Sequence, residues 1–301
     1  MASPMDMRAP SLPAPQRAAI AFMLGAGALV AATSLMAKAL GADAAGASGL
    51  HPFQVSAGRF VFALCALAVL LAVRPAMRPT LTGAQWDLHL ARSLCGCLGV
   101  TAMFAAVARM PVAEATAVSF LSPLVTMGLA ALMLRERLGP VRLTAAGLAL
   151  AGALLVLRPG TDAFQIAGLF ALAAAALFGL ESIFIKRLSD REPPVRILLI
   201  NNLIGGAVSL VAASFVWSWP SPLQWLLLAT LGTVMVTGQS MFIQAMRRGE
   251  ASAVIPAFYS VLVFAALYDA LLYGVVPDGI GATGAALIMG SAVLLARRKG
   301  A

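Results

Sequence analysis

Long apolar stretches separated by short polar connections make up most of the chain. A bilayer core of about 30 Å requires about 20 helical residues per crossing. Hydrocarbon offers the backbone no hydrogen-bond partner, and runs such as Leu124 to Leu134 lack the alternation of a barrel strand, so the stretches are predicted to be helices. We predict ten membrane spans, at residues 18–40, 53–73, 87–109, 112–134, 141–158, 163–185, 195–216, 222–246, 250–274 and 279–297.

Lys and Arg residues concentrate in every second connection between the predicted spans. The connections on the side of the N-terminus hold most of the 21 basic residues, whereas the opposite side holds Arg109 and Arg158. Because cytoplasmic loops carry an excess of Lys and Arg, both termini are predicted to be cytoplasmic. We expect a multi-pass protein of the bacterial inner membrane, with residues 1–17 as a disordered cytoplasmic tail.

Composition agrees with this topology and excludes other classes of protein. Hydrophobic residues make up 61% of the chain and charged residues 11%, which excludes a soluble globule and a disordered chain. The net charge of +9 would favour nucleic-acid binding in a soluble protein. Here the position of the basic residues explains the charge, so the expected partner is the lipid bilayer and not a nucleic acid.

An internal repeat relates the two halves of the chain. Met103-Phe104, Arg109 and the run Glu114-Ala115-Thr116-Ala117-Val118 recur as Met241-Phe242, Arg247 and Glu250-Ala251-Ser252-Ala253-Val254. The copies lie five helices apart, and five is odd, so the second copy is inverted, as in many secondary transporters. We predict one five-helix repeat at residues 18–158 and another at 163–297, the alternative being a chance match between alanine-rich helices.

Several short motifs follow one another along the chain. They are Arg59, the run from Ala113 to Ala117, Ser122-Pro123-Leu124, Leu134-Arg135-Glu136-Arg137, Leu155-Val156-Leu157-Arg158-Pro159 and the run from Glu250 to Pro256. In this order and spacing they resemble the EamA-type branch of the drug/metabolite transporter superfamily. The resemblance implies an all-α integral membrane protein of ten helices, arranged as two inverted five-helix repeats around a central cavity. It also implies that the cavity is lined mainly by helices 1, 3, 4, 6, 8 and 9 and carries a small metabolite by alternating access.

Ionisable residues within the spans are candidates for function, because placing a charge in the bilayer costs a few kcal/mol. Arg59 lies about 9 Å from the outer edge of its span and Asp269 lies at a similar depth. Arg59 is expected either to contact substrate or to form a structural ion pair with Asp269 or Glu114. The ion-coupling candidates are Glu114, Glu181 and Asp269.

Other interpretations remain open for several of these charges. Glu114 and Glu250 lie in the first turn of their helices, where a carboxylate also stabilises the helix end. Lys38, Arg92 and Glu181 lie close enough to an edge to extend to the lipid headgroups instead.

Polar and aromatic residues along the predicted helices 1, 3, 4, 8 and 9 are the candidates for the cavity wall, since binding pockets combine apolar walls with a few polar groups. Helix–helix hydrogen bonding is the alternative role for the polar ones. Pro123 and Pro256, mid-span in mirrored helices, are candidate hinges. The predicted substrate-binding residues are Ser34, Lys38, Arg59, Thr101, Phe104, Ser119, Gln239, Phe242 and Tyr259.

Enzymatic chemistry finds little support. His51 and His89 fall on opposite sides of the predicted membrane, and the chain has no phosphate-binding Gly-rich loop with Lys and Ser or Thr. We therefore expect no catalytic residues, metal or cofactor. The predicted function is secondary transport, import or export, of a small organic metabolite such as an amino acid, a vitamin or a related amphipathic compound. The alternative is a non-transporting scaffold or a lipid-handling membrane enzyme, and either a monomer or a homodimer fits the sequence.

Overall fold

All regular secondary structure in the described part of the chain is helical. The computed structural model describes residues 14–41, 49–107, 118–157, 166–273 and 279–297, with some side chains in these ranges excepted. The elements are α1 (Ala14–Gly41), α2 (Pro52–Val73), η1 (Pro75–Met77), α3 (Trp86–Val107), α5 (Ser122–Met133), α6 (Pro140–Leu157), α7 (Ile166–Ser189), α8 (Pro194–Ser214), α9 (Pro222–Arg248), α10 (Ala251–Val254), η2 (Ile255–Tyr259), α11 (Ser260–Tyr273) and α12 (Gly279–Arg297).

The helices coincide with the stretches predicted from hydropathy. Within the described ranges, six segments are long and apolar enough to cross a membrane, and shorter apolar helices accompany them. The six are Gln16–Gly41, Pro52–Val73, Gly168–Ser189, Pro194–Ser214, Pro222–Arg248 and Ala251–Tyr268. The predicted tail lies almost entirely outside the described residues, as does the first part of the predicted span 112–134.

The predicted span 250–274 is not one uninterrupted α-helix. It begins as the short α10, continues as the 3₁₀ segment η2 and resumes as α11. Pro256 lies in the 3₁₀ segment, because proline has no N–H to donate and its ring clashes with the preceding helical turn. Pro123 instead lies in the first turn of α5, directly after a non-helical turn. Both prolines therefore mark places where helical hydrogen bonding changes.

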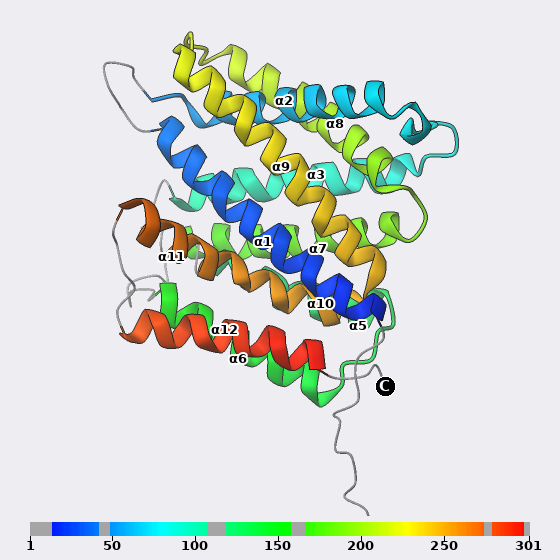
Figure 1. The fold of residues 1–301 in the computed structure, drawn as a ribbon, viewed down its shortest axis with the longest axis vertical. Helices are drawn as coiled ribbons and strands as arrows, with labels where there is room; N and C mark the ends of the chain where they lie inside the picture. Colours follow the sequence, from blue (N-terminus) through cyan, green and yellow to red (C-terminus); the bar gives the residue numbers. More distant parts are fainter. Residues whose placement is uncertain (1–13, 42–48, 108–117, 158–165, 274–278, 298–301) are drawn as a thin grey trace, which may run out of the picture.

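The helices pack side by side in a single bundle (Figure 1). Helix α1 packs along α9, α3 along α7, and α6 along α12. Helix α2 packs against both α8 and α9, while α5 contacts α7 and α11 contacts α1. In the view of Figure 1, α6 and α12 form one side of the bundle and α2 and α8 the other.

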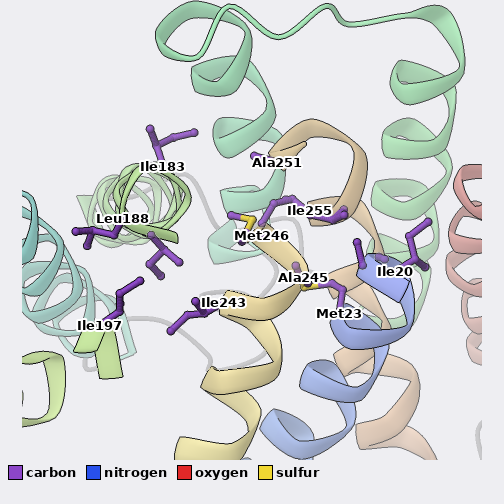
Figure 2. Packing of buried hydrophobic residues seen from close by; sticks show 14 of the residues in the cluster. Ile20, Met23, Ile183, Leu188, Ile197, Ile243, Ala245, Met246, Ala251 and Ile255 are labelled. Atoms are coloured by element: carbon purple, nitrogen blue, oxygen red, sulfur yellow. The ribbon is translucent and has the colours of Figure 1, made fainter. Parts of the chain in front are cut away.

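The largest buried apolar cluster lies towards the end of the bundle that carries the basic connections, which we call the arginine-rich end. It joins Ile20 and Met23 of α1, Ile183 and Leu188 of α7, Ile197 of α8, Ile243 and Met246 of α9, and Ile255 of η2. Figure 2 shows these side chains converging from helices that are distant in sequence. Close packing of this kind replaces the hydrophobic effect as the force that holds helices together in lipid.

Polar contacts join separate helices at the same end. Arg135 has a φ of 56°, which turns the chain after α5 and is followed by Glu136. The Glu136 carboxylate accepts hydrogen bonds from the backbone N–H groups of Ala251 and Ser252, both at 2.9 Å. From its position between α5 and α6, Glu136 thereby caps α10 and satisfies N–H groups that a helix start leaves unpaired. Arg142 of α6 adds a hydrogen bond of 2.8 Å to the Ser252 hydroxyl and an ion pair with Glu250.

Helices α2 and α9 approach so closely that only glycine fits at their crossing. A Cβ atom on Gly232 would lie 2.8 Å from the backbone oxygen of Arg59 and 2.8 Å from the backbone nitrogen of Ala63. Backbone atoms cannot move aside as the end of a flexible side chain can. The position of Arg59 is thus tied to a glycine on the neighbouring helix.

We predict that Gly232→Ala lowers the free energy of unfolding by about 1–3 kcal/mol, the usual cost of overpacking. Gly147→Ala in α6 is the matched control, because a Cβ atom there meets nothing within 4 Å. The control should be neutral or stabilising by up to about 1 kcal/mol through helix propensity. Thermal unfolding of both variants in detergent tests this, and equal effects at the two glycines would show that the α2–α9 approach is not constrained.

Candidate functional site

A cavity of about 430 Å³ lies among α2, α3, α7, α8 and α9. Its walls are mostly apolar or aromatic, with Phe60 from α2, Val100 from α3 and Phe178 from α7. Charged and polar groups enter it from each of the five helices. They are Ser56 and Arg59 from α2, Ser93 and Cys97 from α3, Glu181 from α7, Asn201 and Ser209 from α8, and Gln239 from α9.

Arg59 is held at the cavity wall by an aromatic contact. Its guanidinium carbon lies 4.0 Å from the centre of the Phe60 ring, within the range of a cation–π interaction. Gly205 of α8 leaves room for that ring, since a Cβ atom there would come within 2.5 Å of it. Among the described residues, no hydrogen bond or ion pair engages the Arg59 guanidinium. Its donors are therefore available to a bound anion.

Glu181 faces the same cavity and pairs with a second arginine. The Nε atom of Arg92 lies 3.7 Å from a Glu181 oxygen, and the Arg92 and Glu181 side chains are 2% and 23% exposed. An Arg92 terminal nitrogen donates to the Ile197 carbonyl at 3.4 Å. The ion pair lets a guanidinium remain inside the bundle, because an unpaired buried charge is strongly destabilising.

Glycines on α3 make this pairing possible. A Cβ atom on Gly96 would lie 3.3 Å from the Glu181 carboxylate, and one on Gly99 would lie 2.7 Å from the Phe178 ring. The small residues let α7 approach α3 and place both side chains of α7 at the cavity.

Two polar atoms at the cavity wall have no hydrogen-bond partner in the described structure. They are the side-chain oxygens of Ser93 and Gln239, and both are buried. Buried polar atoms are normally hydrogen-bonded, and each of these residues lines the cavity. A solute in the cavity could supply the missing partners.

The structure brings together three residues that the sequence singled out. The same cavity is lined by Arg59 and Gln239, which were predicted to bind substrate, and by Glu181, an ion-coupling candidate. The interpretation of Arg92 as a side chain that extends to the headgroups is wrong. Arg92 is 1% exposed, because Glu181 and the Ile197 carbonyl hold it inside the bundle.

Other predicted site residues lie elsewhere. Tyr259 is fully buried and donates a hydrogen bond of 2.5 Å to the Phe120 carbonyl. Phe242 packs edge-on against Phe258, with ring centres 5.5 Å apart. Ser34 is exposed and donates to the Val30 carbonyl of its own helix at 3.2 Å. Ser119 is half-buried just before α5.

Several candidates fall outside what the structure describes. Glu114 lies in one of the gaps between the described ranges, and the side chains of Lys38, Thr101, Phe104 and Asp269 are likewise not described. The alternative ion pairs of Arg59 with Asp269 or Glu114 therefore stay predictions.

Sequence reasoning missed the contribution of α8 to the cavity. Asn201 and Ser209 line it, and the Ser209 hydroxyl lies 3.3 Å from the Ser56 hydroxyl. The adjacent amides Asn201 and Asn202 in an otherwise apolar stretch were the available signal. Ser93 gave no such signal, because a single serine in an apolar helix is typical of helix packing.

Comparison with known proteins places the chain in a family. The model of the EamA-like transporter family matches residues 17–158 and again residues 165–297. The chain belongs to the EamA-like transporter family. It is therefore a transporter and not an enzyme, and a multi-pass membrane protein.

Named relatives agree with this assignment. The chain is 29% identical over 258 residues to an S-adenosylmethionine uptake transporter of Rickettsia felis, covering 86% of this chain and 85% of the relative. It is 32% identical to a riboflavin transporter of Rhizobium johnstonii, covering 70% of each. It is 28% identical to a pseudopaline exporter of Pseudomonas aeruginosa, covering 70% of this chain and 75% of the relative.

A solved crystal structure shows the same fold. It matches with a TM-score of 0.75 and 24% identity, over 92% of this chain and 95% of the other.

We predict that Glu181→Gln lowers the free energy of unfolding by about 3–5 kcal/mol, because it leaves the buried Arg92 without a counter-charge. Glu250→Gln is the matched control, since Glu250 pairs with Arg142 but its side chain is 54% exposed. Exposed ion pairs contribute about 1 kcal/mol or less. Unfolding of both variants in detergent measures the difference, and a Glu181→Gln protein as stable as Glu250→Gln would contradict a structural role for the Arg92–Glu181 pair.

Proposed function

We propose that the protein is a secondary transporter that moves a small organic metabolite across the bacterial inner membrane by alternating access. The observation that carries the proposal is the cavity that holds Arg59, Glu181 and the unpartnered oxygens of Ser93 and Gln239. Membership of a transporter family supports it. We further propose ten helices in two inverted repeats, residues 18–158 and 163–297, with both termini cytoplasmic.

The pairing of helices supports the inverted repeat. Counted as predicted spans, the first span (α1) corresponds to the sixth (α7), and the third (α3) to the eighth (α9). The α1–α9 interface therefore has the α3–α7 interface as its counterpart. Both interfaces are extensive. The α1–α11 and α5–α7 contacts are a second corresponding pair, and α2–α8 and α6–α12 each join two corresponding helices. The two segments matched by the family model point the same way.

The charges around the cavity favour a solute with an anionic group. Arg59 and Arg92 contribute two positive charges and Glu181 one negative charge, which leaves a net charge of +1. A carboxylate is the group that a guanidinium binds best, through paired charge-assisted hydrogen bonds. Aromatic walls at Phe60 and Phe178 provide the apolar contact expected for an amino acid, a vitamin or a related amphipathic compound.

Coupling to an ion gradient is assigned, as part of the same proposal, to an acidic residue of the spans. Glu181 is the candidate at the cavity, where its partner Arg92 and the facing Arg59 surround it. A carboxylate exchanging a proton there would change the net charge that the solute meets. Glu114 and Asp269 remain the other candidates.

We predict that Arg59→Ala weakens solute binding by at least about tenfold, because charge-assisted hydrogen bonds contribute about 1.5–3 kcal/mol. The measurement is thermal stabilisation of the purified protein by a panel of amino acids, riboflavin and S-adenosylmethionine, since a ligand of the folded state stabilises it by mass action. A compound that stabilises the wild type is then tested for uptake or exchange in proteoliposomes.

Two further variants make the result specific. Arg247→Ala removes the same charge from an exposed position at the arginine-rich end and should leave binding unchanged. Arg59→Lys keeps the charge but not the paired geometry, and should fall between Arg59→Ala and the wild type. Unchanged binding and transport in Arg59→Ala would overturn the assignment of Arg59 to the substrate.

A further inference from the structure

A second, larger groove lies in the half of the bundle nearer the arginine-rich end. It has a volume of about 700 Å³ and runs between the last turns of α2, the first turn of α8 and the second half of α9. Leu67 and Leu70 of α2, Leu198 of α8 and Val236 of α9 form its apolar wall. None of the residues lining this groove lines the cavity of Arg59 and Glu181.

Two arginines, Arg78 and Arg196, line the groove, and we call the part of the groove beside them its mouth. Arg196 donates to the Thr80 hydroxyl at 2.8 Å, but its buried Nε atom has no hydrogen-bond partner within the described part of the chain. Arg78 is exposed and donates from its Nε atom to the Leu71 carbonyl at 3.2 Å. Neither of these neutral acceptors balances a guanidinium charge.

Glu192 is the carboxylate that the described part of the chain places beside Arg196, and it is already engaged. Glu192 lies 3.9 Å from Arg196, whereas its oxygens lie 2.9 Å from the His89 ring and accept the Gln85 backbone N–H at 2.7 Å. The shorter contacts place the Glu192 charge towards α3. The mouth of the groove therefore keeps a positive excess.

The start of α8 adds to this positive potential. Helix α8 begins at Pro194 with no side-chain cap and no acidic residue in its first turn, where Arg196 stands instead. The N-terminal end of a helix carries a partial positive charge that favours anions, and a basic residue there is unfavourable. An anion at the mouth would offset the helix dipole and both arginines.

We propose that this groove binds an anionic phospholipid, with the headgroup phosphate between Arg78 and Arg196 and an acyl chain along Leu67, Leu70 and Val236. Charge complementarity selects an anionic headgroup, and the apolar wall selects a lipid over free phosphate. Basic pockets between membrane helices are a known setting for anionic headgroups. Thr237, Ser240 and Gln244 of α9 line the same groove and offer polar partners for the ester region.

The test measures lipid binding to the purified full-length chain by native mass spectrometry and by thermal stabilisation in detergent. The probes are phosphatidylglycerol, phosphatidylcholine with the same acyl chains, and inorganic phosphate. We expect phosphatidylglycerol to bind and stabilise more strongly than phosphatidylcholine, and inorganic phosphate to have no effect at matched concentration. Arg78→Gln and Arg196→Gln should each weaken phosphatidylglycerol binding about fivefold.

Arg137→Gln is the matched control. Arg137 is exposed at the same end of the bundle, after α5, and lies outside the groove. It should bind phosphatidylglycerol as the wild type does. Equal binding of the two lipids, equal stabilisation by inorganic phosphate, or equal losses in Arg137→Gln and Arg196→Gln would each overturn the proposal. Because the assay scores lipid and not solute, its outcome is independent of the transport function proposed for the other cavity.

Discussion

A guanidinium inside an apolar bundle must find its counter-charge within the protein, and the rest of the site follows from this constraint. Arg92 is almost completely buried and lies 3.7 Å from Glu181. The pair can form because Gly96 leaves room for the carboxylate against α3. The close α3–α7 contact permits the pair, and the pair holds Glu181 at the cavity beside Arg59.

Contacts that join the helices and unpaired polar groups lie in different parts of the bundle. Towards the arginine-rich end, the main apolar cluster and the cap that Glu136 provides for α10 join helices from both halves of the chain. The cavity of Arg59, in contrast, leaves Ser93 and Gln239 without partners. Packed helix contacts that hold the bundle together, and unmet hydrogen-bonding groups beside a cavity, are what a solute-binding membrane protein requires.

Hydropathy predicted the helices well because the bilayer imposes a length and a composition on each span. The interruption at Pro256 follows from proline chemistry, and its position could be predicted although the 3₁₀ geometry could not; the hinge role stays a prediction. Site residues were harder, because a single sequence does not tell which face of an apolar helix meets a cavity. Arg59 could be singled out as a rare charge within a span and Gln239 as a polar residue on a predicted cavity helix. The burial of Arg92 and the place of Asn201 and Ser93 at the cavity required the three-dimensional packing.

The most direct test of the account uses a thiol already present at the cavity. Cys97 lines it, whereas Cys65 of α2 is exposed on the bundle surface. In sealed vesicles, a chain that retains Cys97 as its one cysteine should react with a water-soluble, membrane-impermeant thiol reagent. A chain that retains only Cys65 should not react, because Cys65 lies in the middle of the predicted span 53–73, where the exposed surface faces lipid and not water. Equal reactivity of the two, or protection of Cys97 from the reagent on both faces of the membrane, would contradict a solute-accessible cavity at Arg59 and Glu181.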